Sequence, residues 1–373
     1  MTRRIVFAPD SFKGTAKAES VATALATGWA DVRPDDELRV IPMADGGEGT
    51  IDAIAVANPE SRRVPVTVTG PHNRPVETAW LWLPPTAEQP RGAAVVELAC
   101  TSGIELLGDT LSPLDAHTLG FGEAIIDALD KGVSQLLLAI GGSSSTDGGA
   151  GILRALGAHL RDQSGDDAAI GARGLLSLSS VDLSDVVAPP DGGVIILTDV
   201  DSPLTGPRGA ASVFGPQKGL DRTAIEPVDS ALERWATLLR SDARQPGAGA
   251  AGGAGLALYW WGGRLVPGAA AITELVGLAR ELESADLVVT GEGSFDRQSA
   301  AGKAPFHVIG MARNAGLPVA VVAGRIATDA DLGPLATSLS LTEIAGSAAR
   351  AIADPTVWLH EAGRLLAQRF TDE

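Results

Sequence analysis

The sequence is poor in several residue types, and each shortage excludes a class of protein. Among its 373 residues are one cysteine, one tyrosine and three methionines, and aromatic side chains make up only 4%. The single cysteine, Cys100, cannot form an internal disulfide or a thiolate metal cluster. This cysteine usage fits a reducing compartment, so we expect a cytoplasmic protein.

The chain also lacks positive charge. It has 29 Lys and Arg residues against 46 Asp and Glu residues, which gives a formal net charge of −17. Without a basic excess to neutralise phosphates, we expect neither nucleic acid nor an anionic membrane surface as a partner. The five histidines show no paired spacing such as HxxxH, which argues against a zinc site.

Long apolar runs are missing too. No run approaches the roughly 18 residues of a membrane span, and the short apolar stretch before Pro9 is too brief for a signal peptide. What is present is 45% hydrophobic residues with 45 glycines and 23 prolines. This apolar content is ample for buried cores, and the length predicts about two domains.

Short apolar runs that end in polar, glycine-rich segments alternate with helical patterns. Fully apolar strands of this kind indicate a parallel sheet covered on both faces. The middle of the chain differs, because its strands follow one another without a long helix, which suggests an antiparallel or mixed unit. We expect strands at 4–8, 38–43, 63–69, 78–83, 93–98, 136–140, 192–197, 286–290 and 318–323, helices at 16–29, 50–57 and near 151–160, and a surface loop at 161–174.

These patterns predict an α/β sheet built from both chain ends and interrupted by a second α/β unit. The first domain is expected to comprise residues 1–62 and 284–373, with 117–150, and the inserted domain residues 63–116 and 151–283. Ligands of open parallel sheets bind beyond the carboxyl ends of the strands. We therefore expect the active site in the cleft between the two domains.

The segment GGSSSTDGGAG (141–151) is the most informative of the strand-end segments. Glycines on both sides of the run from Ser143 to Thr146 would let backbone N–H groups approach an anion, and a following helix adds its positive N-terminal dipole. Asp147 could cap that helix or face a cation. The alternative is an ordinary tight turn with capping.

Two earlier segments carry carboxylates and a cation. ADGGEGT contains Asp45 and Glu48, a pair suited to Mg²⁺, although Glu48 could serve only the dipole of a first helical turn. APDSFKG contains Asp10, Ser11 and Lys13. Lys13 is a point cation useful for a phosphate or carboxylate, whereas Asp10 and Ser11 could merely cap a turn.

Two later segments add further carboxylates. In TDVDSPLTG, Asp199 and Asp201 would point to opposite faces of an extended segment, so only one is expected to do chemistry. GEGSFD supplies Glu292, Ser294 and Asp296 in a composition that fits a metal and phosphate site. The alternative for GEGSFD is a surface loop with solvated charges.

The segment GAGAAGGAG satisfies G-x-G-x-x-G but in the wrong context. Gln245 and Pro246 precede it instead of a strand. A hinge, or close approach to a neighbouring backbone, is at least as good an explanation of its glycines. A P-loop is excluded, because Ala304 fills the Ser/Thr place after Gly302 and Lys303.

Together these segments resemble the bacterial glycerate kinase type I family. The matching strings run in order over nearly the whole chain: APDSFKG, PMADGGEGT, GGSSSTDGGAG, DVDSPLTGPRGAASVFGPQKG, GAGAAGGAG and DLVVTGEGSFDRQSAAGKAP. The chain departs from the family where Ser143–Thr146 replace a serine–alanine–threonine–asparagine stretch, and where Thr198 replaces a common cysteine. Both changes bear on substrate preference more than on the reaction.

The resemblance implies ATP-dependent phosphorylation of D-glycerate with Mg²⁺, favouring 2-phosphoglycerate. It also implies a flavodoxin-like domain, made from both chain ends, and an inserted domain of restriction-endonuclease-like topology. A homodimer is compatible with the sequence, which gives no oligomeric state. Phosphoryl transfer depends mainly on positioning and charge neutralisation.

Residue roles follow from this reaction as hypotheses. We favour Asp199 as the base, with Asp10 next, and assign Lys13 or Lys218 to offset negative charge or hold the glycerate carboxylate. Substrate contacts are expected from Ser11, Lys218 and Asp201, metal ligation from Asp45, Asp296 and Glu292, and ATP contacts from Gly141, Gly142, Ser143, Ser144, Ser145, Asp147, Gly291 and Gly293.

Two other classes of function stay open at this stage. One is a nucleotide-dependent oxidoreductase that uses Gly247–Gly252. The other is a non-catalytic sensor that binds a small acid on the same scaffold, although the retained carboxylates speak against lost chemistry.

Overall fold

The computed structural model describes residues 2–295, 304–327 and 337–370, and these form two compact units. Unit 1 comprises residues 1–45, 52–59 and 269–373, and unit 2 comprises residues 46–51 and 60–268. Residues 117–150, which the sequence pattern groups with the first domain, belong to unit 2. The reason is that the strand in this segment pairs on both sides with strands of unit 2.

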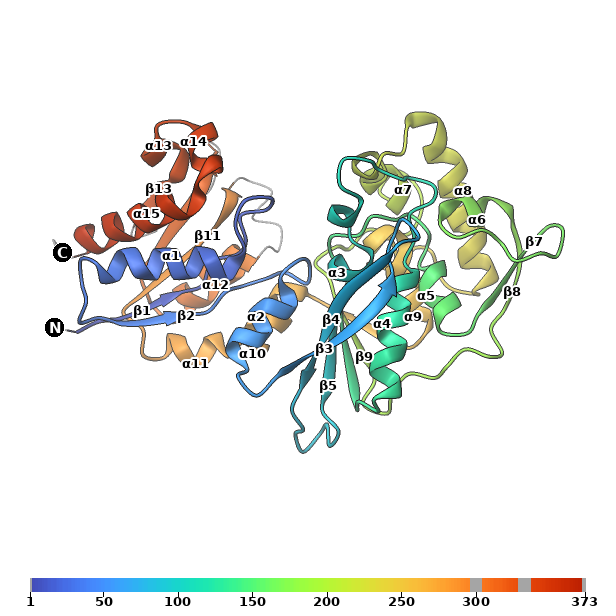
Figure 1. Cartoon of the computed structure of the whole chain (residues 1–373), viewed down its shortest axis with the longest axis horizontal. Coiled ribbons are helices and arrows are strands. Elements are labelled where there is room, and N and C mark those ends of the chain that lie inside the picture. Colours follow the sequence, from blue (N-terminus) through green and yellow to red (C-terminus); the bar gives the residue numbers. More distant parts are fainter. Residues whose placement is uncertain (1, 296–303, 328–336, 371–373) are drawn as a thin grey trace. The chain divides into compact units, whose positions relative to one another are not determined.

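Unit 1 is a parallel sheet with helices on both faces (Figure 1). The spatial order is β13-β12-β11-β1-β2. Numbered within the unit, this is the order 2-1-3-4-5 of flavodoxin-like sheets. The strands are β1 (Arg4–Phe7), β2 (Glu37–Val40), β11 (Leu287–Phe295), β12 (Val319–Ile326) and β13 (Thr337–Ser340).

The central strands of this sheet are apolar on both sides because helices cover both faces. Ile5 and Phe7 pack against α1, and the intervening Val6 is equally buried. The helices of this part are α1 (Ala18–Ala30), α2 (Thr50–Ala57), α10 (Gly268–Leu275), α11 (Leu278–Leu282), α12 (Ala304–Asn314), α13 (Leu341–Ala345), α14 (Ala348–Ala353) and α15 (Pro355–Arg369).

Helices α1 and α15 lie side by side over one face of the sheet (Figure 1). Two glycines allow their backbones to approach. A Cβ on Gly28 would lie 1.9 Å from the carbonyl oxygen of His360, and one on Gly363 would lie 2.1 Å from that of Leu25. On the buried face of α1, Val21, Leu25 and Trp29 are fully buried.

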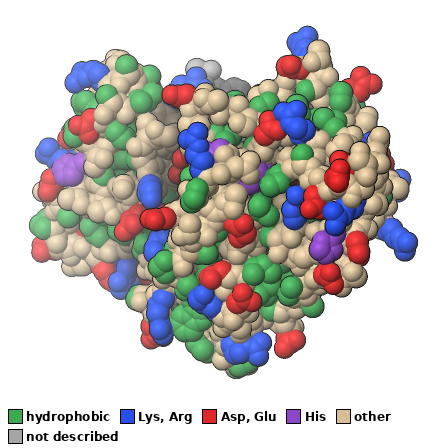
Figure 2. Space-filling model, turned by 45° about the vertical axis from the view of Figure 1, so that its right-hand side comes forward, with side chains coloured by type: hydrophobic (Ala, Val, Ile, Leu, Met, Phe, Trp, Pro, Cys, Tyr) green, Lys and Arg blue, Asp and Glu red, His purple; other side chains and the backbone are tan. Residues whose placement is uncertain are grey.

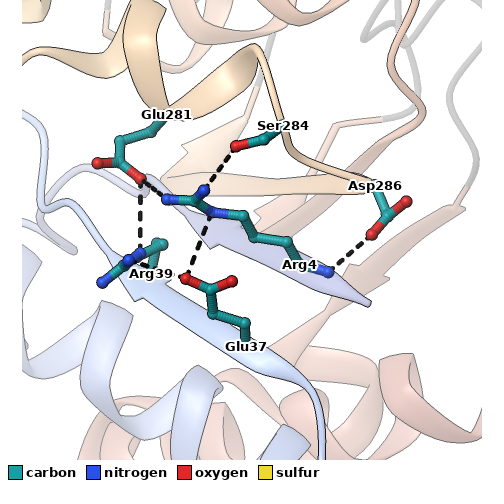
Figure 3. A network of polar contacts seen from close by, with 6 residues as sticks. All are labelled: Arg4, Glu37, Arg39, Glu281, Ser284 and Asp286. Carbon is teal, nitrogen blue, oxygen red and sulfur yellow. Dashed lines mark hydrogen bonds and ion pairs between the residues drawn. The ribbon is translucent and has the colours of Figure 1, made fainter. Parts of the chain in front are cut away.

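An ionic network closes the amino-terminal edge of the same sheet (Figure 3). Arg4 on β1 donates its backbone N–H to Asp286 at 2.7 Å, and its guanidinium contacts Ser284 and Glu281. Arg39 on β2 pairs with Glu37 at 2.8 Å. The network therefore ties β1, β2 and α11 at the edge opposite to the carboxyl ends of the strands.

Unit 2 contains a mixed six-stranded sheet in the order β10-β9-β6-β5-β4-β3. The pairs β3–β4 and β4–β5 are antiparallel, as the helix-free middle of the sequence predicts, and the remaining pairs are parallel. Its strands are β3 (Arg62–Thr69), β4 (Pro75–Leu83), β5 (Ala93–Glu97), β6 (Gln135–Ala139), β9 (Val194–Leu197) and β10 (Gly263–Val266), with a separate pair β7 (His159–Asp162) and β8 (Leu178–Asp182).

Helices and 3₁₀ turns complete unit 2 around one large core. The prediction of a surface loop at 161–174 was partly wrong, because residues 161–162 belong to β7 and residues 172–174 belong to α6 (Ala172–Ser177). The helices are α3 (Ala99–Ser102), α4 (Leu119–Asp130), α5 (Ala150–Ala155), α6 (Ala172–Ser177), α7 (Ala210–Phe214), α8 (Arg222–Leu238) and α9 (Ala254–Trp260), and the 3₁₀ turns are η1 (Ile104–Leu107), η2 (Pro216–Lys218) and η3 (Ala250–Gly253). Among the described helices, none combines the length and apolar character needed to cross a membrane.

Candidate active site

A cavity of about 500 Å³ lies at the carboxyl ends of the strands of unit 1. The chain leaves β1 for β2 on one side, while β11 leads to β12 on the other, so the cavity lies where the strand order reverses. Open α/β sheets bind their ligands at this switch point. The cavity is lined by Asp10, Ser11, Phe12, Lys13, Thr15, Asp45, Glu292, Gly293, Ser294, Gly324, Arg325, Leu341, Thr342, Ala348, Ala351, Ile352 and Pro355.

Asp10 is the most perturbed carboxylate of this cavity. It follows β1, it is 6% exposed, and its backbone N–H donates to the carbonyl of Gly291 on β11 at 2.8 Å. Burial, and after it the charge of Asp45, raises the pKa of Asp10 to about 7, although the N–H of Ser11 and the charge of Lys13 act in the opposite direction. A carboxyl group with a pKa near 7 is suited to accept a proton at neutral pH.

The structure brings most of the residues predicted from the unit 1 strand ends into this cavity. Ser11 and Asp45 are half-buried, Lys13 is exposed, and Glu292 is buried at the end of β11. The predicted ligand Asp296 lies outside the described residues.

The carboxylates that line the cavity offer hard oxygen atoms as possible metal ligands. Asp45 and Glu292 both raise the pKa of Asp10, although each less than burial does, so the cavity carries negative charge that a cation would offset. Mg²⁺ is usually held by one or two carboxylates together with substrate phosphates. The described part of the chain contains no set of three His, Cys, Asp or Glu side chains arranged as metal ligands. Asp45 and Glu292 therefore fit Mg²⁺ that is completed by a phosphate.

The prediction that the strand ends at residue 290 and that a loop begins at Gly291 was wrong. β11 continues to Phe295, which pairs with Ile326 on β12 and is fully buried. A Cβ on Gly291 would lie 1.7 Å from the carbonyl oxygen of Val322, so close strand packing alone requires this glycine. Gly293 does line the cavity.

A second group of predicted residues lies at the carboxyl edge of the sheet of unit 2. There Asp147 is fully buried, and its carboxylate accepts hydrogen bonds from the N–H and hydroxyl of Thr118, the hydroxyl of Ser145, and the N–H groups of Gly149 and Gly151. The sequence left open whether Asp147 caps a helix or faces a cation. These contacts give it a capping role at the start of α5.

Four backbone N–H groups of the 141–151 segment already have backbone acceptors inside unit 2. Each of these N–H groups donates to a backbone carbonyl: that of Gly141 to Gly46, that of Ser144 to Ser102, that of Gly148 to Gly252 and that of Ala150 to Asp147. A phosphate cradle needs N–H groups that are free to turn toward the ligand. The bonded N–H groups, together with the buried Asp147 carboxylate, make this segment less suited to an anion than its composition predicts.

Lys218 is buried behind this segment. Its ammonium donates to the hydroxyl of Ser143 at 2.7 Å and to the carbonyl of Ser145 at 2.6 Å. Burial lowers the pKa of Lys218 to about 7, although the charge of Asp147 acts to raise it. These contacts support a role in holding the loop.

The two aspartates after β9 differ in environment. Asp199 is half-buried and accepts the N–H of Gly268, the first residue of α10, at 2.9 Å. Asp201 is exposed and lies 4.0 Å from Arg208. Asp199 therefore has a helix-capping contact that competes with a catalytic role.

Glu97 was missed by the sequence analysis. It ends the apolar strand β5 and is 2% exposed, and its carboxylate accepts the N–H groups of Gly49 and Ile51 at the start of α2. Cys100 also donates to it, at 3.1 Å. The available signal was a lone carboxylate at the end of a fully apolar run, which is rare unless the charge is bonded.

The glycines of the segment GAGAAGGAG serve close backbone approach. A Cβ on Gly249 would lie 2.2 Å from the carbonyl oxygen of Pro203, and one on Gly252 would lie 2.0 Å from that of Ser145. Gly252 also has a positive φ of 68°. Packing thus accounts for these two glycines without a dinucleotide.

Comparison with known proteins gives a consistent result over the whole chain. Residues 5–371 match the model of the glycerate kinase family. Glycerate kinase of Halalkalibacterium halodurans is 39% identical over 86% of this chain and 85% of the relative. Glycerate 2-kinase of Escherichia coli is 37% identical over 87% of this chain and 86% of the relative. A crystal structure described as glycerate kinase 2 of Salmonella typhimurium LT2 superposes with a TM-score of 0.79 at 36% identity, covering 100% of this chain and 99% of that one.

Proposed function

Because this chain belongs to the glycerate kinase family and is a kinase, we propose that it transfers the γ-phosphate of ATP to the 2-hydroxyl of D-glycerate, giving 2-phosphoglycerate and ADP. Membership of a kinase family argues against the two alternatives that the sequence left open, an oxidoreductase and a non-catalytic sensor. The observation that carries the proposal is the cavity of unit 1, which joins Asp10, Lys13 and two further carboxylates at a switch point. The choice of the 2-hydroxyl is supported by the name of the E. coli relative.

Asp10 is the better-supported base of the two aspartates considered. It lines the cavity, it is buried, and its carboxyl group is suited to take up the proton of the attacking hydroxyl. Asp199 stays a prediction, because its carboxylate already accepts the N–H of Gly268. Lys13 is exposed at the same cavity, which supports a role in offsetting the charge of the transferring phosphoryl group.

Mg²⁺ would be held by Asp45 and Glu292, with Asp296 as a further predicted ligand. Bound there, it would neutralise charge on the phosphates of ATP. Ser11, whose N–H holds the Asp10 carboxylate, is a candidate for orienting the glycerate. The contacts of Asp201, exposed in unit 2, give it no such support.

The reaction is tested with purified protein, ATP, Mg²⁺ and D-glycerate in an assay that couples ADP release to NADH oxidation. Phosphorus NMR of the product separates 2-phosphoglycerate from 3-phosphoglycerate, and L-glycerate, tartronate and hydroxypyruvate serve as comparison substrates. ADP release that does not depend on glycerate would refute the proposed acceptor. A 3-phosphoglycerate signal would refute the proposed position of transfer.

The choice of base is tested with Asp10→Asn and Asp199→Asn side by side. We expect kcat to fall by about 10²–10⁴ for Asp10→Asn, the range of general base catalysis, and much less for Asp199→Asn. The reverse order would restore Asp199 as the base. Circular dichroism of both variants checks that the fold persists.

A further inference from the structure

The cavity of unit 1 is lined by two chemically different sets of residues. Asp10, Lys13, Asp45 and Glu292 lie at the strand termini and are charged, whereas α13, α14 and the start of α15 contribute mainly small or apolar side chains. Three of them, Ala348, Ala351 and Ile352, recur at the i, i+3, i+4 spacing of one face of α14. We call this set the apolar wall, and it consists of Leu341, Ala348, Ala351, Ile352 and Pro355.

Glycerate alone does not account for the apolar wall. It is a three-carbon acid with an oxygen atom on every carbon, so it gains nothing from apolar contact. A cavity of about 500 Å³ falls in the range of roughly 300–1,000 Å³ that holds larger ligands. The second substrate of a kinase has the matching structure, with a polyphosphate at one end and a flat heteroaromatic base at the other.

The placement of the wall agrees with this match. Ile352 is 62% exposed, so an apolar ligand surface would remove it from water. The cavity also lies at the switch point of a flavodoxin-like sheet, where nucleotides bind. By contrast, four N–H groups of the 141–151 segment in unit 2, those of Gly141, Ser144, Gly148 and Ala150, are already bonded internally.

We infer that the apolar wall is the subsite for the nucleoside of ATP, with the base against Ile352 and Ala351 and the triphosphate directed toward Lys13. This inference rests on the proposed kinase function and adds to it the unit and the helix that hold the donor. It assigns α14, which carries none of the residues predicted for the reaction, to recognition of the nucleotide.

The test uses Ile352→Glu and Ala348→Glu, two substitutions at exposed positions that put a charge on the wall. The matched control is Val357→Glu on α15, which is 52% exposed and does not line the cavity. We expect the apparent KM for ATP to rise about 10-fold or more in both wall variants, because each places a charged carboxylate on a surface that the bound nucleoside would remove from water. The KM for glycerate should change less than about two-fold, and Ile352→Leu should behave as the wild type.

Binding without turnover supplies the second measurement. Fluorescent mant-ADP is titrated into each protein without glycerate, and adenosine is used as a competitor that carries no phosphate. Weaker mant-ADP binding in both wall variants, with the control unchanged, supports the inference. Unchanged mant-ADP binding in Ile352→Glu, or a rise confined to the KM for glycerate, overturns it.

The same data distinguish failure of the inference from failure of the proposed function. If the wild type binds mant-ADP through the wall but turns over no ATP with D-glycerate, the acceptor is wrong and the nucleoside subsite stands. If turnover is normal and the wall variants bind mant-ADP as the wild type does, the kinase stands and the subsite is wrong.

Discussion

At the scale of single residues, the buried ammonium of Lys218 makes stability depend on pH. Its pKa is about 7 in the folded protein and 10.5 in the unfolded chain. Between these values the unfolded chain binds a proton that the folded protein does not, so stability rises with pH across this window. Below pH 7 both states carry the proton, and the cost of burying the charge is then present in full.

We therefore expect the wild type to gain stability relative to Lys218→Met as the pH rises. The gain should be at most about 1.4 kcal/mol for each pH unit between about 7 and 10. Urea denaturation of both proteins at pH 6, 7, 8 and 9 measures it, and charges elsewhere cancel in the difference. A difference that does not change with pH would show that Lys218 stays charged in the folded protein.

Substitution of Gly291, which lies in the family motif GEGSFD, tests whether this glycine is needed for strand packing or for ligand binding. A Cβ at this position would lie 1.7 Å from the carbonyl oxygen of Val322 on the neighbouring strand, and neither backbone can move without breaking the β11–β12 ladder. Gly291→Ala should destabilise the protein by about 1–3 kcal/mol or more, as overpacking does.

Gly310 provides the control for this experiment. It lies within α12, and no atom of the described residues outside that helix comes within 4 Å of its Cβ position. Gly310→Ala should raise the free energy of unfolding by about 0.5–1 kcal/mol through helix propensity alone. Equal, small effects of the two substitutions in thermal denaturation would argue against the packing explanation for Gly291.

At the scale of elements, carboxylates at strand ends hold helix starts. Glu97 at the end of β5 accepts two N–H groups at the start of α2, and Asp199 after β9 accepts the first N–H of α10. Unsatisfied N–H groups of a first helical turn attract negative charge. Both α2 and α10 begin where the chain passes from unit 2 to unit 1, between residues 51 and 52 and between 268 and 269.

Glu97→Gln should therefore loosen the start of α2. The amide keeps the size of the side chain but offers one acceptor oxygen instead of two, so one buried N–H loses its partner at a cost of about 1–3 kcal/mol. Hydrogen exchange should become faster for the amides of Gly49 and Ile51. Glu123→Gln is the matched control, because Glu123 accepts from the N–H and hydroxyl of Thr69 in the same unit. Faster exchange at 49–51 in the control as well would contradict a local role of Glu97.

The buried strands and several helices were predictable from the sequence because periodicity and buried apolar runs are local properties. The helix predicted at 50–57 has these bounds in the structure, and the strands predicted at 63–69 and 93–98 differ from β3 and β5 by one residue. The end of β11 was not predictable, because GEGSF is glycine-rich by composition. Only pairing with β12, a contact distant in sequence, keeps it extended.

The candidate site was predictable only in part, because it also depends on contacts that are distant in sequence. Asp10, Lys13 and Asp45 could be found because polar residues at the ends of parallel strands converge. The sequence does not tell whether a polar loop bonds itself, and the Asp147 carboxylate, with its five internal donors, does so. The apolar wall was missed because alanines on a short helix also occur in any ordinary core.

At the scale of the whole molecule, the net charge of −17 opposes both proposed substrates, which are anions. Figure 2 shows acidic and basic side chains interspersed over the visible face without a large basic patch. The attraction for phosphate must then come from local groups such as Lys13, acting against a repulsive field of the whole chain.

This balance predicts an unusual dependence on salt. Screening acts most on distant charges, since the Debye length is about 10 Å at 0.1 M salt, so added salt should weaken the overall repulsion more than the contact with Lys13. We expect kcat/KM for ATP to rise about two- to five-fold between about 10 and 150 mM potassium chloride at constant free Mg²⁺, in contrast to electrostatically steered enzymes. Competition by uncharged adenosine should stay nearly constant over the same range. A fall in kcat/KM with salt would mean that the local cations, not the net charge, dominate the field that ATP meets on approach.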